Sequence, residues 1–222
     1  MHTTKENDPV LSREEALSIL NTPDDQLDDL IARAEKLRRK YKGNHVSIHI
    51  LTNARSGNCS QDCAYCAQSC RSSADIEKYK WVSDEKLYRD NDFVNKNHLA
   101  RHCIGLSGMK FTDAEIEELA AKIRKMKETG THLCCSIGFL TEKQARILKE
   151  AGLDRINHNL NSSRAFYPDI CSTHTFDQNG IRIFSYRNRI FRQGCTEFII
   201  SCTTGIFPGK FEIKAIFFSR FF

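Results

Sequence analysis

The sequence lacks several features that would place the protein in a special class. No apolar run approaches the roughly eighteen residues that a membrane helix requires, so we expect no membrane partner. The stretch Met1–Pro9 is polar and lacks the apolar core of a signal peptide, so we expect a cytoplasmic protein. No repeat of about 20–50 residues and no low-complexity linker occurs, which excludes a repeat array. The 222 residues, 40% of them hydrophobic, suffice for a core in one large domain or two small ones.

Basic charge is concentrated in one part of the chain. The formal net charge is +5, but the residues from Gln178 onward contain seven Lys or Arg residues and only two Glu. The same segment contains nine of the fourteen Phe residues. The rest of the chain is therefore neutral overall, and we expect no nucleic-acid partner. The change in composition marks residues 179–222 as a divergent tail that is assigned to no domain.

Capping motifs and hydrophobic periodicity predict an α/β fold. Ser12 with Glu15, and Thr112 with Glu115, form capping-box patterns ahead of amphipathic stretches. The expected elements are a helix from residue 12, a helix over 24–41, a strand over 46–51, a helix over 112–129, a strand over 132–137, a helix over 141–152 and a strand over 154–160. This alternation predicts a parallel sheet, preceded by an N-terminal helical segment over residues 1–45.

The chain contains ten cysteines, which in a reducing compartment indicate metal binding or catalysis rather than disulfides. Cys59, Cys63 and Cys66 form a C-x3-C-x2-C cluster directly after a predicted strand. Three thiolates on one loop suit a [4Fe–4S] cluster with one open iron better than a closed four-ligand zinc site. An open iron can chelate S-adenosylmethionine, whose one-electron cleavage releases a 5′-deoxyadenosyl radical. Spacing alone leaves open a zinc knuckle that recruits Cys70, or a plain electron-transfer cluster.

Two further groups of residues fall on predicted strands. Cys103 and Cys134 lie on consecutive elements of one sheet and are expected to face a common interior, although a lone cysteine is usually a buried apolar residue. Asn157, Asn159 and Asn161 alternate along the last predicted strand, so we expect them to share a face. Because three amides are costly in a dry core, this face is interpreted as a wall that contacts a ligand.

Together these residues resemble the biotin synthase family of the radical S-adenosylmethionine (SAM) superfamily, over about residues 12–178. The segment Cys59-Ser-Gln-Asp-Cys-Ala-Tyr-Cys-Ala-Gln-Ser69 resembles the superfamily, whereas Cys103, Cys134 and the Asn157-His-Asn-Leu element resemble biotin synthases in particular. The resemblance implies a partial TIM-type (β/α) barrel over residues 46–178, with the chemistry near the carboxyl ends of its strands. It also implies the insertion of sulfur into dethiobiotin to form biotin. The alternatives are a hydrogenase-maturation or methylornithine-forming radical SAM enzyme, and a non-catalytic metal- or nucleic-acid-binding module.

The resemblance implies two metal centres. Cys59, Cys63 and Cys66 are expected to ligate the [4Fe–4S] cluster that binds and cleaves S-adenosylmethionine. Cys103 and Cys134 are expected to ligate an auxiliary [2Fe–2S] cluster, the proposed sulfur donor. An electron donor of the flavodoxin or ferredoxin type and a homodimer are further implied.

The resemblance also implies contacts to the organic ligands. Tyr65, between two cluster ligands, is expected to contact the adenine. Asn157 and Asn159 are expected to contact dethiobiotin and the nucleoside ribose. Asn161 occupies a position where the family usually has Asp, and it completes the set of candidate ligand contacts.

The resemblance ends where the composition changes. Charge, Phe content, periodicity and family match all change near Gln178. We therefore expect a disrupted reading frame at this point and a truncated family member with impaired activity. Cys195 and Cys202 are both candidates for a third auxiliary-cluster ligand, although neither stands in the expected register.

Overall fold

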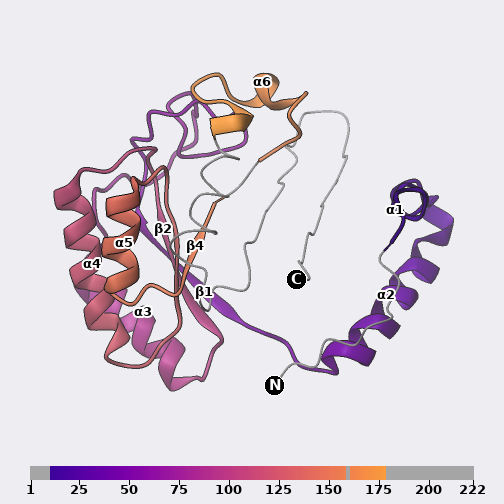
Figure 1. Cartoon of the computed structure of the whole chain (residues 1–222), viewed down its shortest axis with the longest axis horizontal. Coiled ribbons are helices and arrows are strands. Elements are labelled where there is room, and N and C mark those ends of the chain that lie inside the picture. The colour runs from indigo at the N-terminus through magenta and orange to yellow at the C-terminus, as the bar shows by residue number, and fades with distance from the viewer. Residues whose placement is uncertain (1–10, 159–160, 179–222) are drawn as a thin grey trace. The chain divides into compact units, whose positions relative to one another are not determined.

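The structure, a computed structural model, describes residues 11–158 and 161–178 (Figure 1). It divides into two compact units, the first ending at Val46 and the second beginning at Ser47. Predictions for Asn159, Cys195, Cys202 and the divergent tail concern residues outside the described ranges. Among the described residues, no helix has both the length and the apolar character needed to cross a bilayer.

The first unit is helical, as its sequence predicts. It contains α1 (Arg13–Leu20), the 3₁₀ turn η1 (Asp24–Gln26) and α2 (Leu27–Lys42). The capping box is confirmed, because Ser12 Oγ accepts from the amide of Glu15 while the Glu15 carboxylate accepts from the amide of Ser12. The predicted second helix begins as η1, directly after the extended Pro23, and becomes α-helical at Leu27.

The second unit is an α/β sheet structure. Its elements are β1 (His49–Arg55), α3 (Asp84–Lys96), β2 (Arg101–Leu106), α4 (Asp113–Lys127), β3 (Leu133–Ser136), α5 (Glu142–Glu150), β4 (Arg155–Asn157) and α6 (Tyr167–Ile170). The four strands are all parallel and follow the order β1-β2-β3-β4, and α3, α4 and α5 lie on one side of the sheet (Figure 1). The predicted α/β class is confirmed, and the described residues form a partial barrel of the TIM type.

The hydrophobic core lies between the sheet and these three helices. Alternate strand residues, such as Ile104 and Cys135, are buried in this core, while their neighbours Cys103 and Cys134 point to the opposite face. One polar residue, His102, is completely buried beside the core. Its Nε2 lies 2.8 Å from Thr52 Oγ1, and burial lowers the pKa of the imidazole to about 4.

Strand boundaries differ from the sequence-based expectation. The strand expected over 46–51 runs instead from His49 to Arg55, because it pairs with β2 from His49 opposite Arg101 to Arg55 opposite Leu106, with a shift of register after Asn53. The strand expected over 154–160 is confined to Arg155–Asn157. Helix α3 was not expected, although Ser83 caps it through a hydrogen bond from the amide of Lys86.

Candidate functional site

The three clustered cysteines lie on the loop that leaves the carboxyl end of β1. Tight turns compact this loop: the amide of Cys66 donates to the carbonyl of Cys63 at 3.1 Å, and the amide of Cys70 donates to the carbonyl of Gln61 at 2.9 Å. The thiols of Cys59, Cys63 and Cys66 are all partly buried. Burial raises the pKa of Cys63 to about 12, with further contributions from the charges of Cys171, Cys66 and Cys59. Thiolates this close repel one another, and bound iron would stabilise their charged forms. The donor set therefore fits an iron–sulfur cluster.

Tyr65 lies between two of these cysteines, as its position in the sequence requires. Its side chain is 37% exposed, while its hydroxyl hydrogen-bonds with Cys63. Burial of the hydroxyl, and then the charge of Cys63, raise the pKa of the phenol. Tyr65 is therefore neutral and presents part of an aromatic ring at the surface of the cysteine loop.

A segment more than one hundred residues away packs against the same loop. Asp62, which is 3% exposed, accepts hydrogen bonds from the backbone amides of Ser172 and Thr173 at 3.0 and 3.1 Å. The hydroxyls of the same two residues also donate to this carboxylate, and the thiol of Cys171 donates to it at 3.3 Å. These bonds, led by the one from the Ser172 hydroxyl, hold the pKa of Asp62 far below its usual range. Asp62 is therefore ionised at neutral pH and holds the segment against the cysteine loop.

This anchoring brings further chemistry to the loop. The Cys171 sulfur lies 3.9 Å from that of Cys63 and 3.2 Å from Nδ1 of His174. Asp62, Cys171 and His174 are not among the site residues predicted from the sequence. The Cys-Ser-Thr-His spacing, in which two metal-binding side chains stand three residues apart, was the signal that could have identified Cys171 and His174.

The structure brings Cys103 and Cys134 into direct contact on the face of the sheet opposite the helices. They are register partners on β2 and β3 and form a disulfide across 31 residues of sequence. The side-chain amide of Asn157, on β4, donates to the Cys134 sulfur at 3.5 Å. The Asn157 carbonyl oxygen is buried and has no hydrogen-bond partner within the described part of the chain. A buried acceptor beside two sulfurs is the arrangement expected of a site that receives a ligand.

The expected wall of three asparagines is only partly present. Asn157 ends β4, and Asn159 lies outside the described residues. Asn161 has a φ of +65° and therefore stands in a turn rather than on a strand, and its side chain hydrogen-bonds with Tyr167. The expectation that strand alternation aligns Asn161 with Asn157 was wrong, because β4 ends at Asn157 and does not include Asn161.

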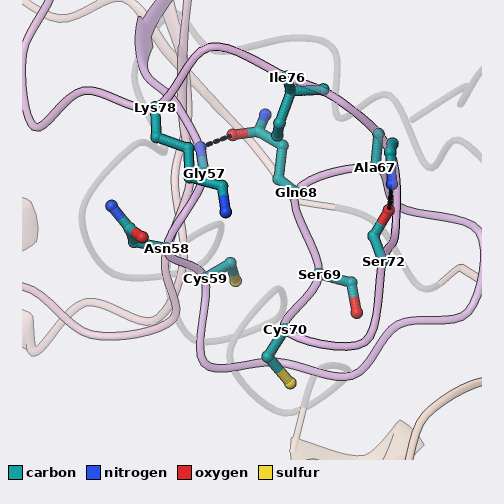
Figure 2. A pocket seen from close by; sticks show the side chains of 11 residues that line it. Gly57, Asn58, Cys59, Ala67, Gln68, Ser69, Cys70, Ser72, Ile76 and Lys78 are labelled. Carbon is teal, nitrogen blue, oxygen red and sulfur yellow. Dashed lines mark hydrogen bonds between the residues drawn. The ribbon is translucent and has the colours of Figure 1, made fainter.

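Two cavities open beside the cysteine loop. One, of about 390 Å³, is lined by Gly57, Cys59, Gln68 and Cys70, and Figure 2 shows the Gln68 side chain accepting from the amide of Gly57. The other, of about 490 Å³, is lined by residues from the carboxyl ends of three strands and from the 171–178 segment. The residues that line this 490 Å³ cavity are Arg55, Asn58, Ser60, Gln61, Gly108, Met109, Lys110, Phe139, Thr173, His174 and Gln178. Both volumes are in the range of small-molecule sites, and this edge of a parallel barrel is where such sites occur.

The chain is similar to curated biotin synthases. It is 39% identical over 168 residues to the biotin synthase of Bacillus cytotoxicus, a match that covers 75% of this chain and 51% of that protein. It is 40% identical over 168 residues to the biotin synthase of Geobacillus kaustophilus, covering 75% of this chain and 50% of that protein. The chain thus spans about half the length of these curated relatives.

Solved structures with low sequence identity share the fold. Methylornithine synthase superposes with a TM-score of 0.71 at 16% identity, covering 86% of this chain and 55% of that one. The FeFe-hydrogenase maturase HydG from Carboxydothermus hydrogenoformans superposes with a TM-score of 0.70 at 17% identity, covering 86% of this chain and 44% of that one. At such identities the likeness shows the fold alone.

The family model of the radical SAM superfamily matches residues 53–184, which is more than half of the chain. The match begins on β1 and includes the cysteine loop, both sulfurs of the Cys103–Cys134 pair and the 171–178 segment. The chain therefore belongs to the radical SAM superfamily and, within it, is similar to the biotin synthases.

Proposed function

We propose that the chain carries the catalytic site of a biotin synthase-type radical SAM enzyme, which inserts sulfur into dethiobiotin. The observation that carries this proposal is the meeting of Cys103, Cys134 and the side chain of Asn157 on the interior face of the sheet. The cysteine loop alone indicates only the superfamily. The additional pair of cysteine sulfurs, beside an asparagine side chain whose buried acceptor is unpaired among the described residues, suits a reaction that transfers sulfur. The identity of about 40% to biotin synthases supports the same substrate class.

The cysteine loop is proposed to hold the first cofactor. Cys59, Cys63 and Cys66 would each ligate one iron of a [4Fe–4S] cluster, whose fourth iron would bind S-adenosylmethionine. When bound, this cluster supplies the electron that cleaves the sulfonium and generates the 5′-deoxyadenosyl radical. The work of the protein is to hold three thiolates in a partly buried loop, where Asp62 fixes the loop against the 171–174 segment.

Organic ligands would bind at the same edge of the sheet. The 490 Å³ cavity lies over the carboxyl ends of the strands and suits a nucleoside-sized ligand. Tyr65, a neutral aromatic side chain on the cysteine loop, is proposed to contact the adenine. Asn159 and Asn161 are proposed to contact the nucleoside ribose.

Sulfur transfer would use the interior face. After a thiol reductant supplies the two electrons that cleave their disulfide, Cys103 and Cys134 are proposed to ligate, as thiolates, an auxiliary [2Fe–2S] cluster that donates the inserted sulfur, with Cys195 or Cys202 as a further ligand. Asn157 donates to one of these sulfurs and keeps its buried carbonyl oxygen available for an N–H of the ureido group of dethiobiotin. A one-electron donor of the flavodoxin or ferredoxin type, a homodimer and a cytoplasmic location complete the proposal.

Anaerobic reconstitution with iron and sulfide tests the proposal. We expect about four irons on the cysteine loop, an EPR signal of the reduced protein that changes on addition of S-adenosylmethionine, and formation of 5′-deoxyadenosine and biotin. Cys63→Ala should abolish the part of the EPR signal that responds to S-adenosylmethionine, whereas Cys70→Ser, which alters an exposed thiol of the same loop, should retain it. Iron uptake that survives replacement of Cys59, Cys63 and Cys66 by alanine would contradict the cluster assignment. Deoxyadenosine without biotin, unchanged in Cys134→Ser, would reject the sulfur-insertion assignment.

A further inference from the structure

Three metal-binding side chains meet at the cysteine loop, and two of them, Cys171 and His174, have no part in the cluster assignment. The Cys63 and Cys171 sulfurs lie 3.9 Å apart, and Nδ1 of His174 lies 3.2 Å from the Cys171 sulfur. The three ligand atoms all lie within 4.8 Å of one another. Cys171 and His174 are buried, and Cys63 is partly buried. Two thiols and an imidazole at these distances form a typical donor set for a transition-metal ion.

Two of the three ligand-atom separations match a single ion rather than a cluster, and the third, between the Cys63 sulfur and His174, lies within 4.8 Å. With a zinc–sulfur bond of about 2.3 Å and a zinc–nitrogen bond of about 2.0 Å, tetrahedral geometry places two thiolates about 3.8 Å apart and a thiolate about 3.5 Å from an imidazole nitrogen. The observed separations of 3.9 and 3.2 Å differ from these values by a few tenths of an ångström at most. Thiolates on different irons of a [4Fe–4S] cluster are separated by the body of the cluster and stand farther apart.

We propose that Cys63, Cys171 and His174 form a mononuclear site for a divalent transition-metal ion of the Zn²⁺ class. Two thiolates neutralise the charge of the ion, and the fourth tetrahedral position is left for water. Binding requires the two thiols to lose their protons, and it requires Nδ1 of His174 to exchange its 2.9 Å contact with Gln61 Oε1 for the metal.

The neighbours of this site hold its ligands in place. Asp62 accepts from the thiol of Cys171 and from the amides of Ser172 and Thr173, so the turn that carries Cys171 and His174 is fixed against the cysteine loop. The ring of His174 also packs edge-on against Tyr167, with 5.7 Å between the ring centroids. Such outer contacts orient the first ligands of a metal site and raise its affinity.

Sharing of Cys63 has a functional consequence. The same sulfur cannot serve the mononuclear ion and the proposed [4Fe–4S] cluster at once. A Zn²⁺-class ion in this site therefore excludes the cluster, and assembly of the cluster must displace the ion. This consequence rests on the proposed function, whereas the existence of the mononuclear site does not.

Cobalt titration tests the site directly. The parent chain and every variant carry Cys195→Ser and Cys202→Ser. Each chain is freed of metal, reduced with a phosphine, kept without air and titrated with Co²⁺. We expect one tightly bound Co²⁺ with thiolate-to-cobalt charge-transfer absorption. Cys171→Ser and His174→Asn should each weaken its binding by about 100-fold or more, because each removes a ligand rather than an outer contact. The matched controls Cys59→Ser and Cys70→Ser should bind as the parent does.

The result that would overturn the site is Co²⁺ binding that is lost in Cys59→Ser but unchanged in Cys171→Ser, since the ion would then use the loop cysteines alone. Zinc X-ray absorption of the parent chain does not depend on the folding of any variant. We expect two sulfur ligands and one imidazole nitrogen, and a shell of three sulfurs without nitrogen overturns the proposal.

Competition with the cluster is measured separately. Prior loading with Zn²⁺ should slow iron–sulfur reconstitution in the parent chain at least about tenfold and have little effect in Cys171→Ser. Equal slowing in both chains rejects the competition while leaving the cobalt result to stand. Failure of the parent chain to assemble any cluster contradicts the proposed function, and the cobalt and zinc measurements still decide the mononuclear site.

Discussion

The anchoring of the 171–174 segment by Asp62 leads to a prediction about stability. Asp62→Asn keeps the shape of the side chain but removes its charge and replaces one acceptor oxygen by an NH₂ group. In the structure, the carboxylate receives the amides and the hydroxyls of Ser172 and Thr173 and pairs with Arg71, whose guanidinium lies 3.2 Å away. The substitution therefore weakens the carboxylate contacts that join the cysteine loop to this segment, and it leaves others, such as that between His174 and Gln61, in place.

The magnitude follows from the number of hydrogen bonds. A hydrogen bond to a charged acceptor stabilises by roughly 1 kcal/mol more than one between neutral groups. Two backbone amides and two hydroxyls donate to this buried carboxylate, so Asp62→Asn should lower the free energy of unfolding by about 4 kcal/mol. Because the folded-state pKa is held below the ordinary 3.8, the difference between parent and variant should be full above about pH 4 and shrink as the pH falls further.

Equilibrium denaturation in urea measures this loss, and amide hydrogen exchange at Ser172 and Thr173 locates it. Asp177→Asn is the matched control, because this exposed carboxylate pairs with Arg164 and should change the free energy of unfolding by less than about 0.5 kcal/mol. An Asp62→Asn protein that is as stable as the parent, with unchanged exchange at both amides, would refute the reasoning that the carboxylate holds the two segments together.

Three further predictions concern the sheet and its interior. Because the folded pKa of His102 is lowered to about 4 from 6.5, stability should rise by about 3 kcal/mol between pH 4 and 6.5, and His102→Gln should flatten this part of a pH series of urea melts. Gly138→Ala should cost about 1–3 kcal/mol in the same assay, because a Cβ there would stand 2.5 Å from two backbone carbonyl oxygens, whereas Gly105→Ala, with its first contact at 3.6 Å, should cost little. Asn157→Leu should leave iron content and deoxyadenosine formation unchanged but lower biotin formation roughly tenfold or more, measured by mass spectrometry; unchanged biotin formation would remove Asn157 from the site.

Local features of this protein are readable from the sequence because the interactions that create them span only a few residues. The capping boxes at Ser12, Thr112 and Thr141 each join groups three residues apart, and each starts a helix in the structure. The C-x3-C-x2-C loop follows a strand for the same reason, since its turns connect near neighbours. The alternation of these elements was sufficient to predict a parallel α/β sheet.

Tertiary structure alone decided which distant residues meet. The length of β1 depends on its pairing with β2, and β4 is too short to align Asn161 with Asn157. The Asp62 carboxylate accepts from the amide of Ser172, which is 110 residues away in the sequence, and no local sequence pattern predicts this contact. The contact depends on the path of the whole sheet, which returns the chain after β4 to the carboxyl edge of β1. Local sequence patterns therefore predicted α1, α2, α4, α5 and the cysteine loop, but not α3 or α6. The packing of the sheet placed Cys171 and His174 beside Cys63, because contacts between distant segments are set by the fold and not by neighbouring residues.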